Sequence, residues 1–152
     1  MLAILGGAKW KRQTAREIEL LSSRVESSRA RVSRYDRASI SALPKPVRRY
    51  FDFVLTQGQP MVASACIEWT GKFSMRPHRW SAFSATQHYH VQPPGFVWDA
   101  QVWITGMVPV LVRDSYADRE GSLKAAIGGI VKVADASGTS EIAKGELLRY
   151  LG

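Results

Sequence analysis

Cysteine is nearly missing from this sequence: Cys66 is the only one among 152 residues. A single thiol excludes an intramolecular disulfide and a four-cysteine zinc site. No run approaches the roughly 20 apolar residues that span a bilayer. The opening "MLAILGG" is too short for the apolar core of a secretory signal, which needs about 7–15 residues after a cationic start.

Several catalytic signatures are missing as well. The chain has no glycine-rich phosphate loop, no G-x-S-x-G elbow and no H-E-x-x-H pair. Their absence counts against the common hydrolases and nucleotide enzymes. We therefore expect no cofactor and assign no metal centre.

The composition that remains is that of a folded domain. Hydrophobic residues make up 45% of the chain and charged residues 22%, which are globular values. A chain of this length fits one domain with a sizeable core.

Positive charge is concentrated in the first third of the chain. Residues 1–50 hold 12 Lys and Arg against 4 Asp and Glu, whereas residues 51–152 hold 9 of each, so the whole net charge of +8 lies in the first part. Such a basic arm is either a solvated helix face or a contact for an anionic partner, a membrane surface or nucleic acid. The candidate contact residues are Lys9, Lys11, Arg12 and Arg16.

Helical periodicity appears in three places. Residues 9–35 carry a narrow stripe with a 4-3-4 spacing (Thr14, Ile18, Leu21, Val25, Ser28, Val32), which predicts a helix that docks loosely or needs a partner. "PVRRYFDFVL" predicts a core-docking helix, and "SEIAKGELLRYLG" predicts a C-terminal one. We expect a basic helical arm and connector over 1–42 and an α+β domain over 43–152.

Between the second and third predicted helices, apolar residues recur at every second position. Residues 61–135 read as about five strands separated by short turns such as "QPPG" and "DREG", which is typical of an antiparallel meander. "GSLKAAIGGIVKVAD" is taken as a single strand. The predicted fold class is therefore α+β, with a curved antiparallel sheet between N-terminal helices and a C-terminal helix.

His88 and His90 form an H-x-H pair on one face of a predicted strand. Two histidines so placed can bind a metal ion if a third ligand joins them, for which His78, Asp99 and Cys66 are the candidates. Histidines on an exposed strand face are common, and we prefer that interpretation.

Eight of the fifteen aromatic residues fall between Trp69 and Trp103. Aromatic strands can stack nucleic-acid bases, but such strands also carry basic residues, and Lys and Arg are sparse between 80 and 112. We therefore expect the aromatics to serve packing or an apolar ligand, and we do not expect nucleic acid as a partner.

The stretch "PPGFVWDAQVWITGMVPVLVRDSYAD" (93–118) contains three charges between apolar runs. A three-residue hairpin centred on Gly106 would pair residues whose numbers sum to 212. Asp99 then lies opposite Arg113, a cross-strand pair worth roughly 0.2–1 kcal/mol. Asp114 falls on the apolar face opposite Trp98, where it either sits at the rim, accepts a buried hydrogen bond or serves a function.

Five blocks carry a family resemblance: "LPKPVRRYF", "ATQHYHVQPPGFVWDAQV", "VPVLVRDSYADREGSL", "VKVADASG" and "EIAKGELLRYLG". Together they resemble the successive blocks of a bacterial family of uncharacterised proteins, from Leu43 to the end. The resemblance implies that relatives continue beyond the last helix into more strands, so this chain resembles their N-terminal portion. It also implies that some relatives carry an apolar segment before the basic helix, which "LAILGG" resembles.

Three functions remain open from the sequence. The first is a non-catalytic domain that binds an apolar or lipid-like ligand in a half-open sheet. The second is an enzyme that uses Asp114 with His88 or His90 as acid and base. The third is contact of the basic arm with a membrane surface or nucleic acid. The sequence leaves the compartment open, either the cytoplasm or the periphery of the cytoplasmic membrane. The candidate ligand-binding residues are Phe96, Trp98, Trp103 and Tyr116.

Overall fold

A computed structural model describes residues 2–27, 33–104 and 108–151. Within these residues the helices are α1 (Leu2–Ser27), the short 3-10 helix η1 (Arg37–Ile40), α2 (Lys45–Val54) and α3 (Ser140–Leu151). The strands are β1 (Ser64–Arg76), β2 (Arg79–His90), β3 (Gly95–Trp103), β4 (Val110–Ala117), β5 (Glu120–Ile127) and β6 (Val131–Ser137).

The strands form one antiparallel meander in the order β1-β2-β3-β4-β5-β6, which confirms the predicted α+β class. The described residues contain six strands where about five were expected. Gly128 and Gly129 are the reason, because both have positive φ and reverse the chain between β5 and β6. Glycine adopts this conformation without steric cost, so the double glycine is a turn and not part of a strand.

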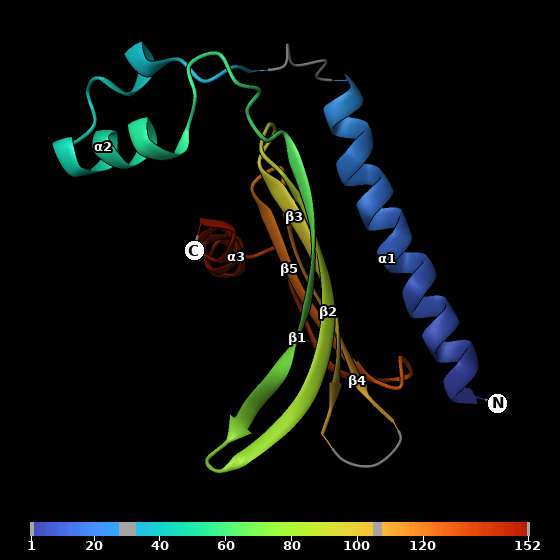
Figure 1. Cartoon of the computed structure of the whole chain (residues 1–152). Helices are drawn as coiled ribbons and strands as arrows, with labels where there is room; N and C mark the ends of the chain where they lie inside the picture. Colours follow the sequence, from blue (N-terminus) through green and yellow to red (C-terminus); the bar gives the residue numbers. More distant parts are fainter. Residues whose placement is uncertain (1, 28–32, 105–107, 152) are drawn as a thin grey trace.

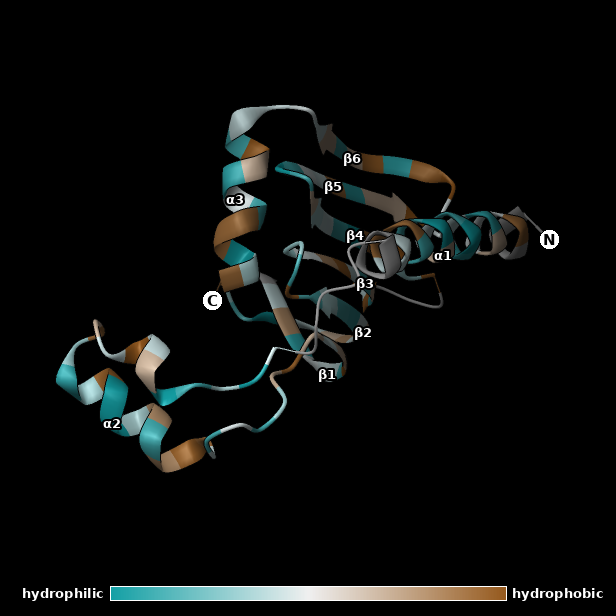
Figure 2. Ribbon diagram, turned by 90° about the horizontal axis from the view of Figure 1, so that it is seen from above, coloured by the Kyte–Doolittle hydropathy of each residue, from teal (hydrophilic) through white to brown (hydrophobic). Residues whose placement is uncertain are grey.

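The sheet separates two helices. Helix α1 lies along one face and α3 lies against the other, and the β1–β2 hairpin curls toward the α3 side (Figure 1). A view from above shows the same arrangement (Figure 2). We refer to these surfaces as the α1 face and the α3 face.

The register of the β3–β4 hairpin agrees with the prediction. Phe96 pairs with Tyr116, Trp98 with Asp114, and Asp99 with Arg113. The turn at Gly106 lies outside the described residues. Because side chains alternate along a strand, Asp114 points to the α3 face, whereas Asp99 and Arg113 point to the α1 face.

Helix α1 begins at Leu2, earlier than the sequence indicated, and packs on the sheet of its own chain. Trp10, Thr14 and Leu21 are buried. A Cβ added to Gly6 would meet the Gly128 carbonyl oxygen at 2.7 Å, so only glycine allows this approach. Ser28 and Val32 of the predicted stripe lie outside the described residues. No described helix is both long and apolar enough to cross a membrane.

Helix α2 corrects the expectation of a core-docking helix. None of its residues is buried, and the Phe53 side chain is 89% exposed. The helix lies away from the sheet (Figure 2). Its contacts are with the neighbouring segment that contains η1, as in the Arg37–Asp52 ion pair of 2.7 Å. An amphipathic pattern specifies an apolar face, but it does not specify what covers that face.

Candidate functional site

Asp114 lies at the centre of the α3 face and is only 2% exposed. Its carboxylate accepts a hydrogen bond from the Arg149 guanidinium of α3, and that guanidinium stacks 4.4 Å above the Trp98 ring. The rim position considered for Asp114 is therefore wrong, and a buried polar partner is present. Burial raises the pKa of Asp114, and Arg149 opposes the rise.

A second buried carboxylate, Glu146, joins this cluster from α3. Burial and the nearby charge of Asp114 raise its pKa to about 7, while Arg149 opposes the rise. Asp114 Oδ1 and Glu146 Oε2 are both buried without a hydrogen-bond partner among the described residues. Glu146 was not singled out from the sequence, although its helical spacing of three residues from Arg149 places the two on one side of α3.

Phe96 and Tyr116 are buried on the α3 face close to this cluster, and Trp98 is partly exposed. Tyr150 of α3 contacts the Tyr89 ring at 6.0 Å between centroids. Three of the four candidate ligand-binding residues thus share one face. The fourth, Trp103, points to the α1 face by its register with Ala82.

On the α1 face, Asp99 meets the helix rather than water. The Trp10 indole donates a hydrogen bond of 2.7 Å to Asp99 Oδ1, and the Thr14 hydroxyl lies 3.2 Å from the same oxygen. Burial raises the pKa of Asp99, and the two hydrogen bonds oppose the rise. Asp99 and Arg113 are the cross-strand neighbours that the sequence predicted, but contact of both residues with α1 was not predicted.

Arg113 is 1% exposed and anchors α1 to β4. Its Nη1 donates a hydrogen bond of 2.8 Å to the Thr14 hydroxyl, and its guanidinium lies 4.8 Å from the centre of the Trp10 ring. Its Nε is 3.1 Å from Glu17 Oε1, but without the geometry of a hydrogen bond. Trp10 was not singled out from the sequence, although its position four residues before Thr14 extends the predicted stripe toward the N-terminus.

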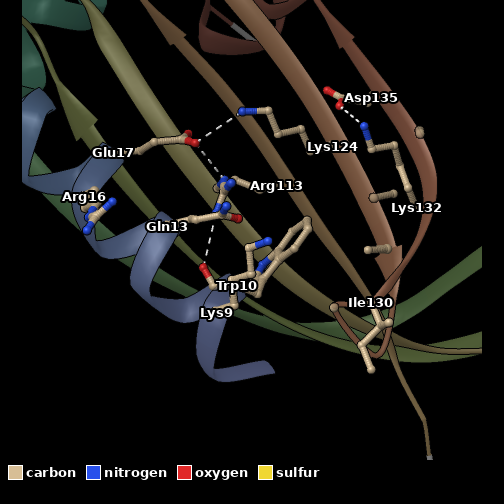
Figure 3. Close-up of a pocket in the computed structure, with 14 residues that line it drawn as sticks. Lys9, Trp10, Gln13, Arg16, Glu17, Arg113, Lys124, Ile130, Lys132 and Asp135 are labelled. Atoms are coloured by element: carbon tan, nitrogen blue, oxygen red, sulfur yellow. Dashed lines mark hydrogen bonds and ion pairs between the residues drawn. The ribbon is translucent and has the colours of Figure 1, made fainter. Parts of the chain in front are cut away.

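A cavity of about 540 Å³ opens beside Arg113, between α1 and strands β5 and β6 (Figure 3). Glu17 projects from α1 toward Arg113 and Lys124, and Lys132 pairs with Asp135 at the β6 side. We call this cavity the α1–β6 pocket. Its charged lining residues are Lys9, Arg16, Glu17, Arg113, Lys124, Lys132 and Asp135.

The four cations proposed for anionic contact are all exposed on α1, but they lie on different sides of the helix. Lys9 and Arg16 line the α1–β6 pocket, whereas Lys11 borders a smaller cavity near Asp99. Arg12 donates to the Ala8 carbonyl of its own helix. The sequence analysis did not group Lys124 and Lys132 with the cations of the basic arm, because these lysines approach α1 only in the folded sheet.

The acid–base pairing of Asp114 with a histidine does not form. Cys66 pairs with His88 and His90 pairs with Gly95 across the strands, which places both histidines on the face opposite Asp114. Cys66 Sγ lies 3.9 Å from His88 Nε2 on the exposed surface. No group of three metal-ligating side chains occurs within the part of the chain that the structure describes.

Comparison with known proteins gives one family. No curated protein and no solved structure matches the chain. A family model described as a family of unknown function (DUF6544) matches residues 33–152, which include every strand and α3 but not α1. The chain belongs to this family of unknown function, DUF6544.

Proposed function

We propose that this domain is a non-catalytic binding protein that holds an apolar, lipid-like ligand against the α3 face. The observation that carries the proposal is the exposure of large apolar side chains on that face. Trp69 is 43% exposed and Phe73 is 51% exposed on β1. Contiguous exposed apolar surface on a soluble protein is usually a binding surface.

The exposed part of the α3 face lies on β1 and β2. Ile67, Trp69 and Phe73 alternate along β1 and share one face. Phe83 of β2 joins them, since its ring would be 3.0 Å from a Cβ placed at Gly71. The curl of the β1–β2 hairpin toward α3 (Figure 1) makes this surface concave, a shape suited to a ligand of low polarity.

The α3 end of the same face bounds the exposed surface. Phe96 and Tyr116 form a closed floor there, and Trp98 with Arg149 gives the partly exposed boundary. A ligand with a long apolar part and one polar end would suit this boundary, because the Arg149 charge is the polar group next to the aromatic surface.

Binding of a fluorescent dansyl fatty acid tests this proposal. We expect saturable binding by the wild-type chain, and weakening by at least about tenfold in the double variant Trp69→Ser/Phe73→Ser, because each large apolar side chain contributes roughly 1.5–3 kcal/mol when buried. Trp103→Ser is the matched control: Trp103 is 41% exposed but lies on the opposite face. Absence of saturable binding, or an equal loss in the control, would refute the proposal.

A second candidate is contact of α1 with an anionic bilayer. It is favoured by the exposure of Lys9, Lys11, Arg12 and Arg16 on one helix. Binding to vesicles that contain phosphatidylserine should then weaken steeply between low and physiological salt, as screening and counterion release require. The variant Lys11→Glu/Arg12→Glu should abolish it. Equal binding to neutral phosphatidylcholine vesicles would contradict this candidate.

A further inference from the structure

We infer that the α1–β6 pocket is a binding site for a phosphate group, carried either by a small soluble molecule or by a lipid headgroup. The site is separate from the apolar surface proposed above, because it lies on the opposite face of the sheet. Its cavity of about 540 Å³ falls within the range of about 300–1,000 Å³ that is usual for small-molecule sites.

The charge of the pocket lining favours an anion. The lining contains five cations, Lys9, Arg16, Arg113, Lys124 and Lys132, against the two acids Glu17 and Asp135, an excess of three positive charges. A concave surface with a net charge focuses its field into the cavity, where counter-ions concentrate.

The ion pairs within the pocket leave this excess largely uncompensated. Glu17 is shared between two cations, with Oε1 at 3.1 Å from Arg113 Nε and 3.6 Å from Lys124 Nζ. Lys132 is paired with Asp135 at 2.6 Å. Lys9 and Arg16 form no ion pair with the residues that the structure describes, so they and the half-paired Lys124 remain available to an anion.

Arg113 gives the pocket a fixed charge at its base. Its guanidinium is held by the Trp10 ring and by the Thr14 hydroxyl, and its Nε lies 3.1 Å from Glu17 Oε1. Arginine presents a rigid fork of donors that suits phosphate oxygens. An Arg held in a fixed position with Lys9, Lys124 and Lys132 around the same cavity is a suitable arrangement for a phosphate group.

The walls leave room for more than a phosphate. Ala125, Ala126 and Ala134 have small side chains, Gly129 has none, and Ile130 adds an apolar contact. The hydrogen-bonded register of β5 and β6 places Lys124 opposite Asp135 and Lys132 opposite Ala126, so the lysines stand around this small-residue floor. The bound molecule is therefore a phosphate ester whose organic part occupies the remaining volume.

Isothermal titration of the whole chain with glycerol 3-phosphate tests the soluble source in about 0.1 M salt, where exposed charges more than about 10 Å apart are largely screened. Flotation with phosphatidylcholine vesicles, with and without phosphatidic acid, tests the lipid source. Saturable binding in either arm is expected, and the arm that binds identifies the source. Lys124→Met/Lys132→Met should weaken it by at least about tenfold, since charge-assisted hydrogen bonds are the strong ones.

Lys72→Met/Lys144→Met is the matched control, because it removes the same charge from exposed positions outside the pocket. It should leave the dissociation constant within about twofold, the change expected for distant surface charges at moderate salt. Binding in neither arm overturns the inference. So does an equal loss in the control, or vesicle binding that depends on Lys11 and Arg12 but not on Lys124 and Lys132.

Discussion

Replacing Arg113 by methionine is expected to lower the free energy of unfolding by about 3–5 kcal/mol, the range for breaking a buried ion pair by removing one partner. Arg113 is fully buried, and its loss leaves Glu17 with Lys124 alone and removes the hydrogen bond to Thr14. The Trp10 ring also loses its stacked guanidinium. Urea denaturation gives the midpoint and slope needed to measure the change.

Two further variants serve as controls for the Arg113→Met measurement. Arg12→Met removes the same group from the exposed side of α1, and it should change stability by no more than about 0.5 kcal/mol. Arg113→Met/Glu17→Met removes both charges, so it should recover part of the loss, because no partly buried carboxylate is left with Lys124 as its one remaining cation. A loss below about 1 kcal/mol in Arg113→Met would mean that the helix does not depend on this anchor.

Arg113 and Asp114 are neighbours in β4 and explain why charges interrupt its apolar pattern. Successive side chains in a strand point to opposite faces, so the two charges serve different helices. Arg113 is held by Trp10 and Thr14 of α1, and Asp114 is held by Arg149 of α3. These hydrogen bonds can form only where α1 and α3 lie at these positions on the sheet.

The sequence could predict much of the sheet but not what covers it. The β3–β4 register follows from pairing symmetry about a short hairpin, and it correctly separates Asp99 and Arg113 from Asp114. From the sequence alone the α1 face is expected to face solvent, because Asp99 and Arg113 are charged residues on that side of the sheet. Only the long-range contact with α1 shows that this row is buried.

The opposite error arises for α2. The apolar stripe of this helix predicts burial, yet Tyr50 and Val54 of that stripe are exposed. Periodicity reports which residues share a face, whereas docking depends on chain segments far away in sequence. For the same reason the α1–β6 pocket could not be predicted, since Lys9 and Lys124 meet only through the tertiary fold.

The free energy of unfolding should depend on pH through Glu146, which is protonated in the folded protein below about pH 7. Its pKa is about 7 in the folded state against an ordinary value of 4.5. The folded protein therefore binds a proton more tightly than the unfolded chain between these values, and stability should fall as pH rises from about 4.5 through about 7. The raised pKa values of Asp114 and Asp99 act in the same direction.

Glu146→Gln removes this titration while keeping the shape of the side chain. We expect the variant to match the wild type near pH 5 and to be more stable at pH 8 by on the order of 1–3 kcal/mol, because the wild type then carries a buried charge beside Asp114. Glu141→Gln on the exposed start of α3 is the matched control, and the lowered pKa of Glu141, from hydrogen bonds at the helix start, gives any effect the opposite sign. Urea midpoints measured from pH 5 to pH 8 decide the question. An unchanged pH slope in Glu146→Gln would show that Glu146 is already ionised in the folded protein, with Arg149 neutralising it together with Asp114.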